Sequence, residues 1–463
     1  MTTAGSPDLT AIAQRALRHA HGDEALVTVS HERSLTSRFA RSRPTQATAV
    51  DDLSVELACV REGRVATATA RGPGDGALRE AATRVASAAA AAARGGPGDY
   101  PGLPAPAGPP LPHDGWDHET ARLDPGMPAA ALRTAFAVAA EHGLEAHGIW
   151  TAGEVRTAVA STTGVMAADA VTDAHLKVVC RDVDGARSGY ASRTASAAGA
   201  IDAREVAGEA ARRAPAGERA VLAPGEYPVV LDADAVGVLL EYLGSLAFNG
   251  LAHAEGRGAL AGRLGMRVAA AAVNLSDSPS YPGTLPRAFD AEGVPRRPLP
   301  LIQDGVAHRV VHDTRSAAFA GRGAHTTGHA LAPGGTPEGP VPTNLVLVGG
   351  GARDVAELAL PIERGLYVTR LWYVNPVHPK RTLLTGMTRE GTFLIEDGLI
   401  SRPVRDVRFT DSALRILDAT EALTSAPRLV SEAEHYGRRH ATGVVCPALR
   451  ARGFRITGGA PAA

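Results

Sequence analysis

The stretch DADAVGVLLEYLGSLAFNG, residues 232–250, decides how the second half of this 463-residue chain is expected to fold. Its apolar side chains recur at i, i+3, i+4, i+7 and i+10, namely at Val236, Leu239, Leu240, Leu243 and Leu246. That spacing puts them on one face and predicts an amphipathic helix packed into a core. Asp232 or Asp234 can cap the first turn, and Gly250 can end the helix.

A proline-marked break, APAGERAVLAPGEYP at residues 214–228, precedes this helix. Proline and glycine interrupt helices and central strands, so the break is typical of a linker. The chain is also longer than one ordinary core supports. We therefore predict two domains, residues 1–222 and residues 223–463.

The N-terminal half alternates between helical and strand-like patterns. Helical spacing occurs at residues 8–20, 77–94, 127–142 and 202–214. Strand patterns occur at 25–32, in a meander at 45–70 that turns at Glu62-Gly63, and in two strand pairs at 145–162 and 164–181. A segment dense in proline and glycine, residues 95–117, reads as a wrapping loop. We expect an antiparallel sheet with helices.

The C-terminal half is richer in turns and short strands. LPLIQDGVAHRVVHD (299–313) and GTFLIEDGLISRPVRDVRFT (391–410) each place an Asp-Gly turn between apolar runs. Asp-Gly at that place is a strong hairpin signal. Few helical patterns interrupt these strands. The fold class predicted for the whole chain is therefore α+β, with a mostly antiparallel β domain at the C-terminal end.

The composition argues against two classes of partner. Basic and acidic side chains nearly cancel, giving a net charge of −1, which supplies no field to attract nucleic acid or an anionic membrane. No apolar run approaches the roughly 20 residues that a membrane span needs, and the first residues lack a secretory signal. The three cysteines form no CxxC pair and no disulfide framework. We expect a cytoplasmic protein.

Several stretches together resemble the TldD/PmbA metallopeptidase family. GVLLEYLGSLAFNG is similar to its zinc-helix region, and further similarity lies at residues 256–279, 287–321, 326–347 and 365–410. The resemblance covers residues 225 to 458 approximately, and it is closest to the TldE/PmbA branch, whose members lack the zinc motif. Catalytic members carry His-Glu-x-x-x-His directly after a GVLL-like run. Here the ligand, base and second-ligand positions hold Glu241, Tyr242 and Leu246.

Those three replacements remove the chemistry of the motif. A catalytic zinc needs three protein ligands and an open position for water. Leu246 cannot ligate, Glu241 alone is one weak oxygen donor, and Tyr242 is a poor base near neutral pH. The family's third ligand is a cysteine near the C-terminus, and Cys446 lies in the similar region. Without histidines we expect Cys446 to be a small buried apolar residue, and we expect no catalytic residue and no metal in this chain.

The resemblance implies a non-catalytic, TldE-like subunit of a heteromeric zinc metallopeptidase that cleaves peptides or unfolded polypeptides. A TldD-like partner would supply the zinc and the base, in a heterodimer or heterotetramer. This chain would supply part of the interface and of the substrate channel. The candidates for lining that channel are His325, His329, Trp372, Tyr373 and Asn375. Loop histidines more often bond the backbone, which favours a structural role for His325 and His329. The aromatic residues can equally be interface anchors.

Two other functions stay open at this point. A stand-alone hydrolase would use Cys446 or Ser245 as nucleophile, although no local nucleophile–base pattern supports it. A peptide-binding or regulatory module would need no partner of the TldD type. Family members have also been called modulators of DNA gyrase, but the charge balance gives no physical support for direct contact with DNA.

Overall fold

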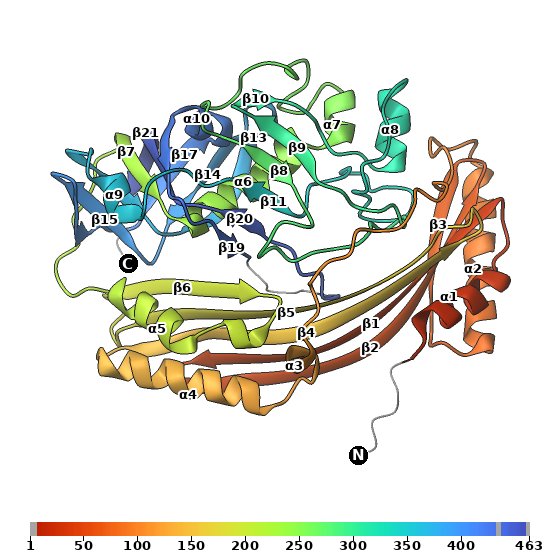
Figure 1. The fold of residues 1–463 in the computed structure, drawn as a ribbon, viewed down its shortest axis with the longest axis horizontal. Coiled ribbons are helices and arrows are strands. Elements are labelled where there is room, and N and C mark those ends of the chain that lie inside the picture. Colours follow the sequence, from red (N-terminus) through yellow and green to blue (C-terminus); the bar gives the residue numbers. More distant parts are fainter. Residues whose placement is uncertain (1–6, 432–436, 460–463) are drawn as a thin grey trace.

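The computed structural model describes residues 7–431 and 437–459, and the N-terminal half forms one long, curved sheet (Figure 1). Its six strands are all antiparallel and lie in the order β3-β2-β1-β4-β5-β6. They are β1 (Glu24–Ala40), β2 (Arg43–Arg61), β3 (Arg64–Ala70), β4 (Glu145–Ser161), β5 (Met166–Arg181) and β6 (Ser188–Ala195). The predicted antiparallel sheet is confirmed.

Helices pack at both ends of this sheet and create two separate cores. One core joins the sheet to α1 (Leu9–Arg18) and α2 (Asp75–Ala93), and the other joins it to α4 (Gly126–Glu141) and α5 (Ala203–Arg212). The short α3 (His118–Ala121) and the 3-10 turn η1 (Ala198–Ala200) complete this half. Four of the helices lie where helical spacing predicts them.

The predicted strand pairs at 145–162 and 164–181 are wrong in one respect. Each is a single long strand, and β4 and β5 pair with each other continuously from Glu145–Arg181 to Ala160–Met166. Gly153 lies inside β4 without turning the chain. Glycine is needed there for space, because a Cβ atom would come within 2.6 Å of the Arg439 guanidinium.

The C-terminal half contains two sheets with α6 (Ala233–Ala247) between them. One sheet follows the order β13-β14-β17-β21-β7-β12-β15-β16, with β18 paired to β21, and the other follows β10-β9-β8-β11-β20-β19. Only β7–β12 and β11–β20 are parallel among the named strand pairs of the described residues. The predicted α+β class, with a mostly antiparallel C-terminal half, is therefore confirmed.

The strands of the first C-terminal sheet are β7 (Gly225–Leu231), β12 (Arg364–Val368), β13 (Leu371–His378), β14 (Leu383–Thr388), β15 (Thr392–Glu396), β16 (Leu399–Pro403), β17 (Val407–Ser412), β18 (Thr420–Leu423) and β21 (Leu449–Gly459). Those of the second are β8 (Leu275–Asp277), β9 (Leu299–Gln303), β10 (Val306–Ala307), β11 (Leu345–Leu347), β19 (Arg428–Val430) and β20 (Val444–Cys446). The short helical elements are α7 (Gly250–Ala254), α8 (Thr314–Ala320), η2 (Pro379–Arg381), α9 (Val355–Ala359) and α10 (Ala413–Asp418). Both Asp-Gly turns close hairpins, β9–β10 and β15–β16, as predicted.

Helix α6 begins as predicted and ends earlier than predicted. The Asp232 carboxylate caps it by accepting a hydrogen bond from the Ala233 N–H. The helix stops at Ala247, and Gly250 instead starts α7. Gly250 is needed for close approach, because its N–H donates to the Val311 carbonyl and a Cβ atom would come within 2.3 Å of that oxygen.

Two of the contacts between the N-terminal and C-terminal halves involve loops. The proline-rich loop passes Tyr100 across to Glu292, with 2.9 Å between the phenol and carboxylate oxygens. In the C-terminal half, Arg439 donates two hydrogen bonds of 2.7 and 2.6 Å to the Asp173 carboxylate of β5. Both side chains of that ion pair are 2% exposed, so this pair is shielded from water. None of the helices within the described ranges is long and apolar enough to cross a membrane.

Candidate functional site

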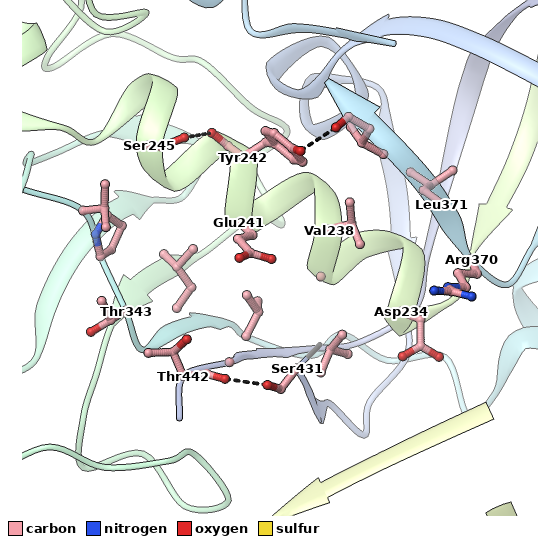
Figure 2. A pocket seen from close by; sticks show the side chains of 18 of the residues that line it. Asp234, Val238, Glu241, Tyr242, Ser245, Thr343, Arg370, Leu371, Ser431 and Thr442 are labelled. Atoms are coloured by element: carbon pink, nitrogen blue, oxygen red, sulfur yellow. Dashed lines mark hydrogen bonds between the residues drawn. The ribbon is translucent and has the colours of Figure 1, made fainter. Parts of the chain in front are cut away.

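Helix α6 has an apolar face that packs into the core and a more polar face that lines a pocket. Val236, Leu239, Leu240 and Leu243 are buried in the core between the two sheets. The other face carries Asp234, Val238, Glu241, Tyr242 and Ser245, which line a pocket of about 720 Å³ (Figure 2). Leu246, predicted as a core residue, is only partly buried at the edge between the two faces.

Three other segments complete this first pocket. They are the start of β13 with Arg370, the loop 341–345, and the chain on either side of β19 and β20, at Val430, Ser431, His440 and residues 442–444. Figure 2 shows Glu241 pointing from the helix toward the wall that carries Thr343 and Thr442. Tyr190 of β6 reaches the same pocket from the N-terminal half. The pocket is therefore built by both halves of the chain.

Buried carboxylates at the start of α6 are neutralised by arginines from distant strands and loops. Asp232 accepts hydrogen bonds from Arg213 and from the Tyr367 hydroxyl, the latter at 2.9 Å. Burial alone would raise the pKa of Asp232, but the charges of Arg213 and Arg428 outweigh that effect and hold the pKa below its usual range. Asp234 accepts two hydrogen bonds from Arg428 of β19. These pairs fix the orientation of the helix start.

The motif positions on α6 make local contacts. The Tyr242 hydroxyl donates to the Val374 carbonyl of β13 at 2.5 Å, and so ties the helix to that strand. The Ser245 hydroxyl donates to the Tyr242 carbonyl one turn earlier. Glu241 is exposed to the pocket. Tyr242 and Ser245 thus support the helix and the strand beside it.

Arginine–aromatic stacking organises the β13 side of the first pocket. The Arg370 guanidinium lies 4.2 Å from the centre of the Tyr190 ring, and the Arg389 guanidinium lies 4.1 Å from that of Trp372. Such contacts are attractive because the ring face is electron-rich. Trp372 and Tyr373 are nevertheless 40% and 73% exposed, so they offer apolar surface at the pocket rim.

A second pocket of about 390 Å³ adjoins the first. It lies between strands of the N-terminal sheet and three segments of the C-terminal half, residues 287–296, 328–333 and 438–440. The two pockets share Val341, Thr343 and His440 in their linings. The two pockets therefore lie side by side at a common wall, and we refer to them together as the channel.

A buried charge network holds that common wall. Asp277 accepts hydrogen bonds of 2.8 Å from the backbone N–H groups of Thr343 and Asn344. It also accepts one of 2.6 Å from Arg296, and His329 lies 3.2 Å away. Burial alone would raise the pKa of Asp277, but the Arg296 charge and the hydrogen bond from the Asn344 N–H outweigh it, and the pKa is well below its usual range. These hydrogen bonds and the ion pair with Arg296 hold the common wall together around Asp277, which is fully buried.

Comparison with known proteins shows which family this chain belongs to. The sequence model described as the PmbA/TldA metallopeptidase C-terminal domain matches residues 224–458, which hold both C-terminal sheets, α6 and most of the channel lining. The chain belongs to the PmbA/TldA metallopeptidase family. The resemblance found in the sequence is thereby confirmed at the level of the family.

Individual relatives of the PmbA/TldA family are distant in sequence. A metalloprotease of Methanothermobacter thermautotrophicus is 29% identical over 206 residues, 44% of each chain, and one of Archaeoglobus fulgidus is 28% identical over 207 residues. The matched segment thus spans less than half the length of these relatives. TldE from Thermococcus kodakarensis has the same fold, with a TM-score of 0.84 and 18% identity over 97% of this chain and 99% of that one. A Bacteroides thetaiotaomicron protein described as a candidate modulator of DNA gyrase gives a TM-score of 0.80 at 19% identity, over 98% and 99%.

The zinc that the PmbA/TldA family implies does not fit the donors present at the motif positions. Glu241, Tyr242 and Leu246 offer one carboxylate, one phenol that already donates to Val374, and one alkyl group. Three ligands are needed. Cys446 is fully buried and its thiol donates to the Ala233 carbonyl at 3.3 Å, eight residues or about 12 Å along the helix from Glu241. Burial raises the pKa of this thiol, so the ligating thiolate is disfavoured.

The predicted channel residues are separated by the fold. Trp372 and Tyr373 line the first pocket, and His329 lines the second, where it is buried. Asn375 is exposed on β13 and bonds the Tyr373 carbonyl, and His325 is exposed on a loop. Neither residue is among those that line the two pockets.

The channel residues that sequence reasoning missed include Arg287, Arg370 and His440. Arg370 had a signal, because it interrupts the apolar strand pattern of GLYVTRLWYV. The other two had none, because they lie in loops whose position depends on contacts with the N-terminal sheet.

Proposed function

We propose that this chain is a subunit of a heteromeric zinc metallopeptidase that carries no zinc of its own and shapes the substrate channel. The observation that carries the proposal is the pocket face of α6. The helix keeps the position that the motif implies, but Glu241 and Tyr242 face the pocket there, and Leu246 packs against the core. A TldD-like partner would supply the His-Glu-x-x-x-His helix, the zinc and the general base.

The shape of the channel supports peptides or unfolded polypeptides as the substrate. Two adjoining pockets have room for an extended chain of a few residues, and folded domains are too large for them. The exposed aromatic pair at Trp372 and Tyr373 supplies apolar contact area at the entrance. A heterodimer or heterotetramer would align this channel with the catalytic groove of the partner.

Purification with and without a partner tests the proposal. We expect the chain alone to hold far less than one zinc per chain by elemental analysis and to cleave no unfolded substrate such as reduced casein. Co-expression with a family chain that carries His-Glu-x-x-x-His should give a stable complex, one zinc per partner chain, and cleavage. Stoichiometric zinc with robust cleavage by the chain alone contradicts the proposal.

Substitutions in the same complex separate the proposal from a stand-alone hydrolase. Ser245→Ala and Cys446→Ala should leave cleavage within about twofold, because Ser245 bonds its own helix and the Cys446 thiol is buried against Ala233. Replacing the motif glutamate of the partner by glutamine should abolish it. Loss of turnover in either serine or cysteine variant, with the partner motif intact, would favour the hydrolase.

A peptide-binding or regulatory module is the second candidate function. It is favoured by one observation: β13 ends its sheet, so the edge beside Trp372 and Tyr373 can accept an added strand. Tight binding of a peptide by the chain alone, with no family partner recovered from its native cells, would support this function over the first.

A further inference from the structure

The second pocket contains a cation without a counter-ion. Arg287 lies in the loop between β8 and β9 and lines this pocket. Two of its guanidinium nitrogens, Nε and Nη2, are buried and have no hydrogen-bond partner among residues 7–431 and 437–459. Burial lowers the pKa of Arg287 to about 10, which still leaves it protonated at neutral pH. The pocket wall therefore holds a full positive charge.

The nearest carboxylates are engaged elsewhere. Asp169 lies 2.9 Å from the His113 Nε2 atom and accepts a hydrogen bond of 3.0 Å from the Ala288 N–H. Asp173 is held by both hydrogen bonds of Arg439. Each attracts Arg287 through space, but neither lies within ion-pair distance of it in the described chain.

The other arginines of the pocket have carboxylate partners. Arg296 pairs with Asp277, and Arg438 lies 3.3 Å from Glu56. Asp290 accepts hydrogen bonds from three backbone N–H groups, those of Glu292, Val294 and Ala330. Arg287 thus differs from every other arginine that lines this pocket.

An unmatched buried charge costs stability, so a fold gains nothing from it unless a ligand completes the pair. A carboxylate is the natural complement, because its two oxygens match the guanidinium fork. A dianion such as phosphate is less suitable, because Glu56, Asp169 and Asp290 line the same pocket. Phe289, Leu331 and Pro333 add an apolar wall for a side chain next to the carboxylate.

We propose that the second pocket binds the C-terminal carboxylate of a peptide, with Arg287 as its anchor. The body of the peptide would then run past Val341, Thr343 and His440 into the first pocket. The choice of a peptide rests on the proposed function, whereas the carboxylate site rests on the pocket itself. Such a site would make this chain select peptides that have a free C-terminal carboxylate.

Calorimetric titration of the isolated full chain tests the site without zinc or cleavage. The probes are N-acetyl-trialanine with a free C-terminus, the same peptide as its C-terminal amide, and an amidated peptide ending in glutamate. We expect the free acid to bind at least about tenfold more tightly than the amide, the effect of one hydrogen-bonded charge pair. The glutamate amide should bind no better than the plain amide.

Three variants identify the anchor. Arg287→Met should remove the preference for the acid, and Arg287→Lys should restore part of it. Arg297→Met is the matched control, because Arg297 is a neighbouring exposed arginine outside the pocket, and it should keep the full preference. The melting temperature of Arg287→Met should equal or exceed that of the native chain, because a partly buried charge without an ionic partner is removed.

Equal binding of acid and amide, or a preference that survives Arg287→Met, overturns the site. A glutamate amide that binds as tightly as the free acid overturns the assignment to C-terminal ends. A melting temperature several degrees lower in Arg287→Met overturns the ligand role in favour of a structural one. Zinc or cleavage found in the chain alone would contradict the proposed function but would leave these titrations unaffected.

Discussion

The two pockets of the channel differ in how their charges are matched. In the first, Asp234 is paired with Arg428, and Tyr242 bonds the Val374 carbonyl. In the second, Arg287 has two buried nitrogens without a partner among the described residues. Matched groups serve the fold by fixing α6 against its neighbours. A charged group without a partner in the fold, such as Arg287, is available to pair with a ligand, so the second pocket is the better place to look for one.

The largest expected effect comes from the wall that both pockets share. Asp277→Ala should lower the free energy of unfolding by about 3–5 kcal/mol, because it leaves Arg296 buried without its partner. Urea unfolding of the isolated chain measures this change. The exposed Asp418→Ala should change stability by less than about 0.5 kcal/mol. An equally small effect of Asp277→Ala would mean that the wall does not depend on its charge network.

The next effect is a pH dependence that originates in the second pocket. Burial, with the charge of Glu292, raises the pKa of Asp290 to about 7, although three backbone N–H groups oppose the rise. The unfolded chain binds this proton only below about pH 4. The stabilising contribution is therefore complete below pH 4 and is lost as the pH rises to 7, by about 2–4 kcal/mol.

Unfolding of the native chain and of Asp290→Asn at pH 4.5 and pH 8 measures that contribution. The native chain should lose more stability than the variant between the two pH values. Identical losses would show that Asp290 ionises normally and that its carboxylate is well stabilised by its three backbone donors.

The smallest effect lies in the first pocket. Tyr242→Phe should cost about 1 kcal/mol, because one hydrogen bond between α6 and β13 is lost. It should not reduce cleavage by the co-expressed complex more than about twofold, because Tyr242 acts here as a structural donor. Loss of cleavage at unchanged stability would instead give Tyr242 a part in the chemistry.

Local patterns predicted most of the fold, and particular residues show why. The Asp-Gly pairs at 304–305 and 397–398 closed hairpins because their turn geometry depends on a few neighbouring residues alone. The apolar stripe of α6 was buried as predicted, at Val236, Leu239, Leu240 and Leu243. Leu246 packs against the same core but is only partly buried. Gly250 was placed wrongly, because its close contact with Val311 comes from a segment distant in sequence.

The site was only half predictable. Glu241, Tyr242 and the aromatic pair at Trp372 and Tyr373 do meet in one pocket. Cys446 does not join them, because β20 carries it to the first turn of α6. The charged residues of the second pocket, Arg287 above all, had no recognisable pattern in the sequence.

The sequence by itself determined the periodicities, the turns, the family resemblance and the residues that stand at the motif positions, since each of these depends on neighbours along the chain. Only the tertiary structure decided which charges are paired. Burial and pairing depend on segments that are far apart in sequence, such as Arg439 against Asp173 across the two halves. The cost of leaving Arg287 unpaired exists only after those segments have met and water has been excluded.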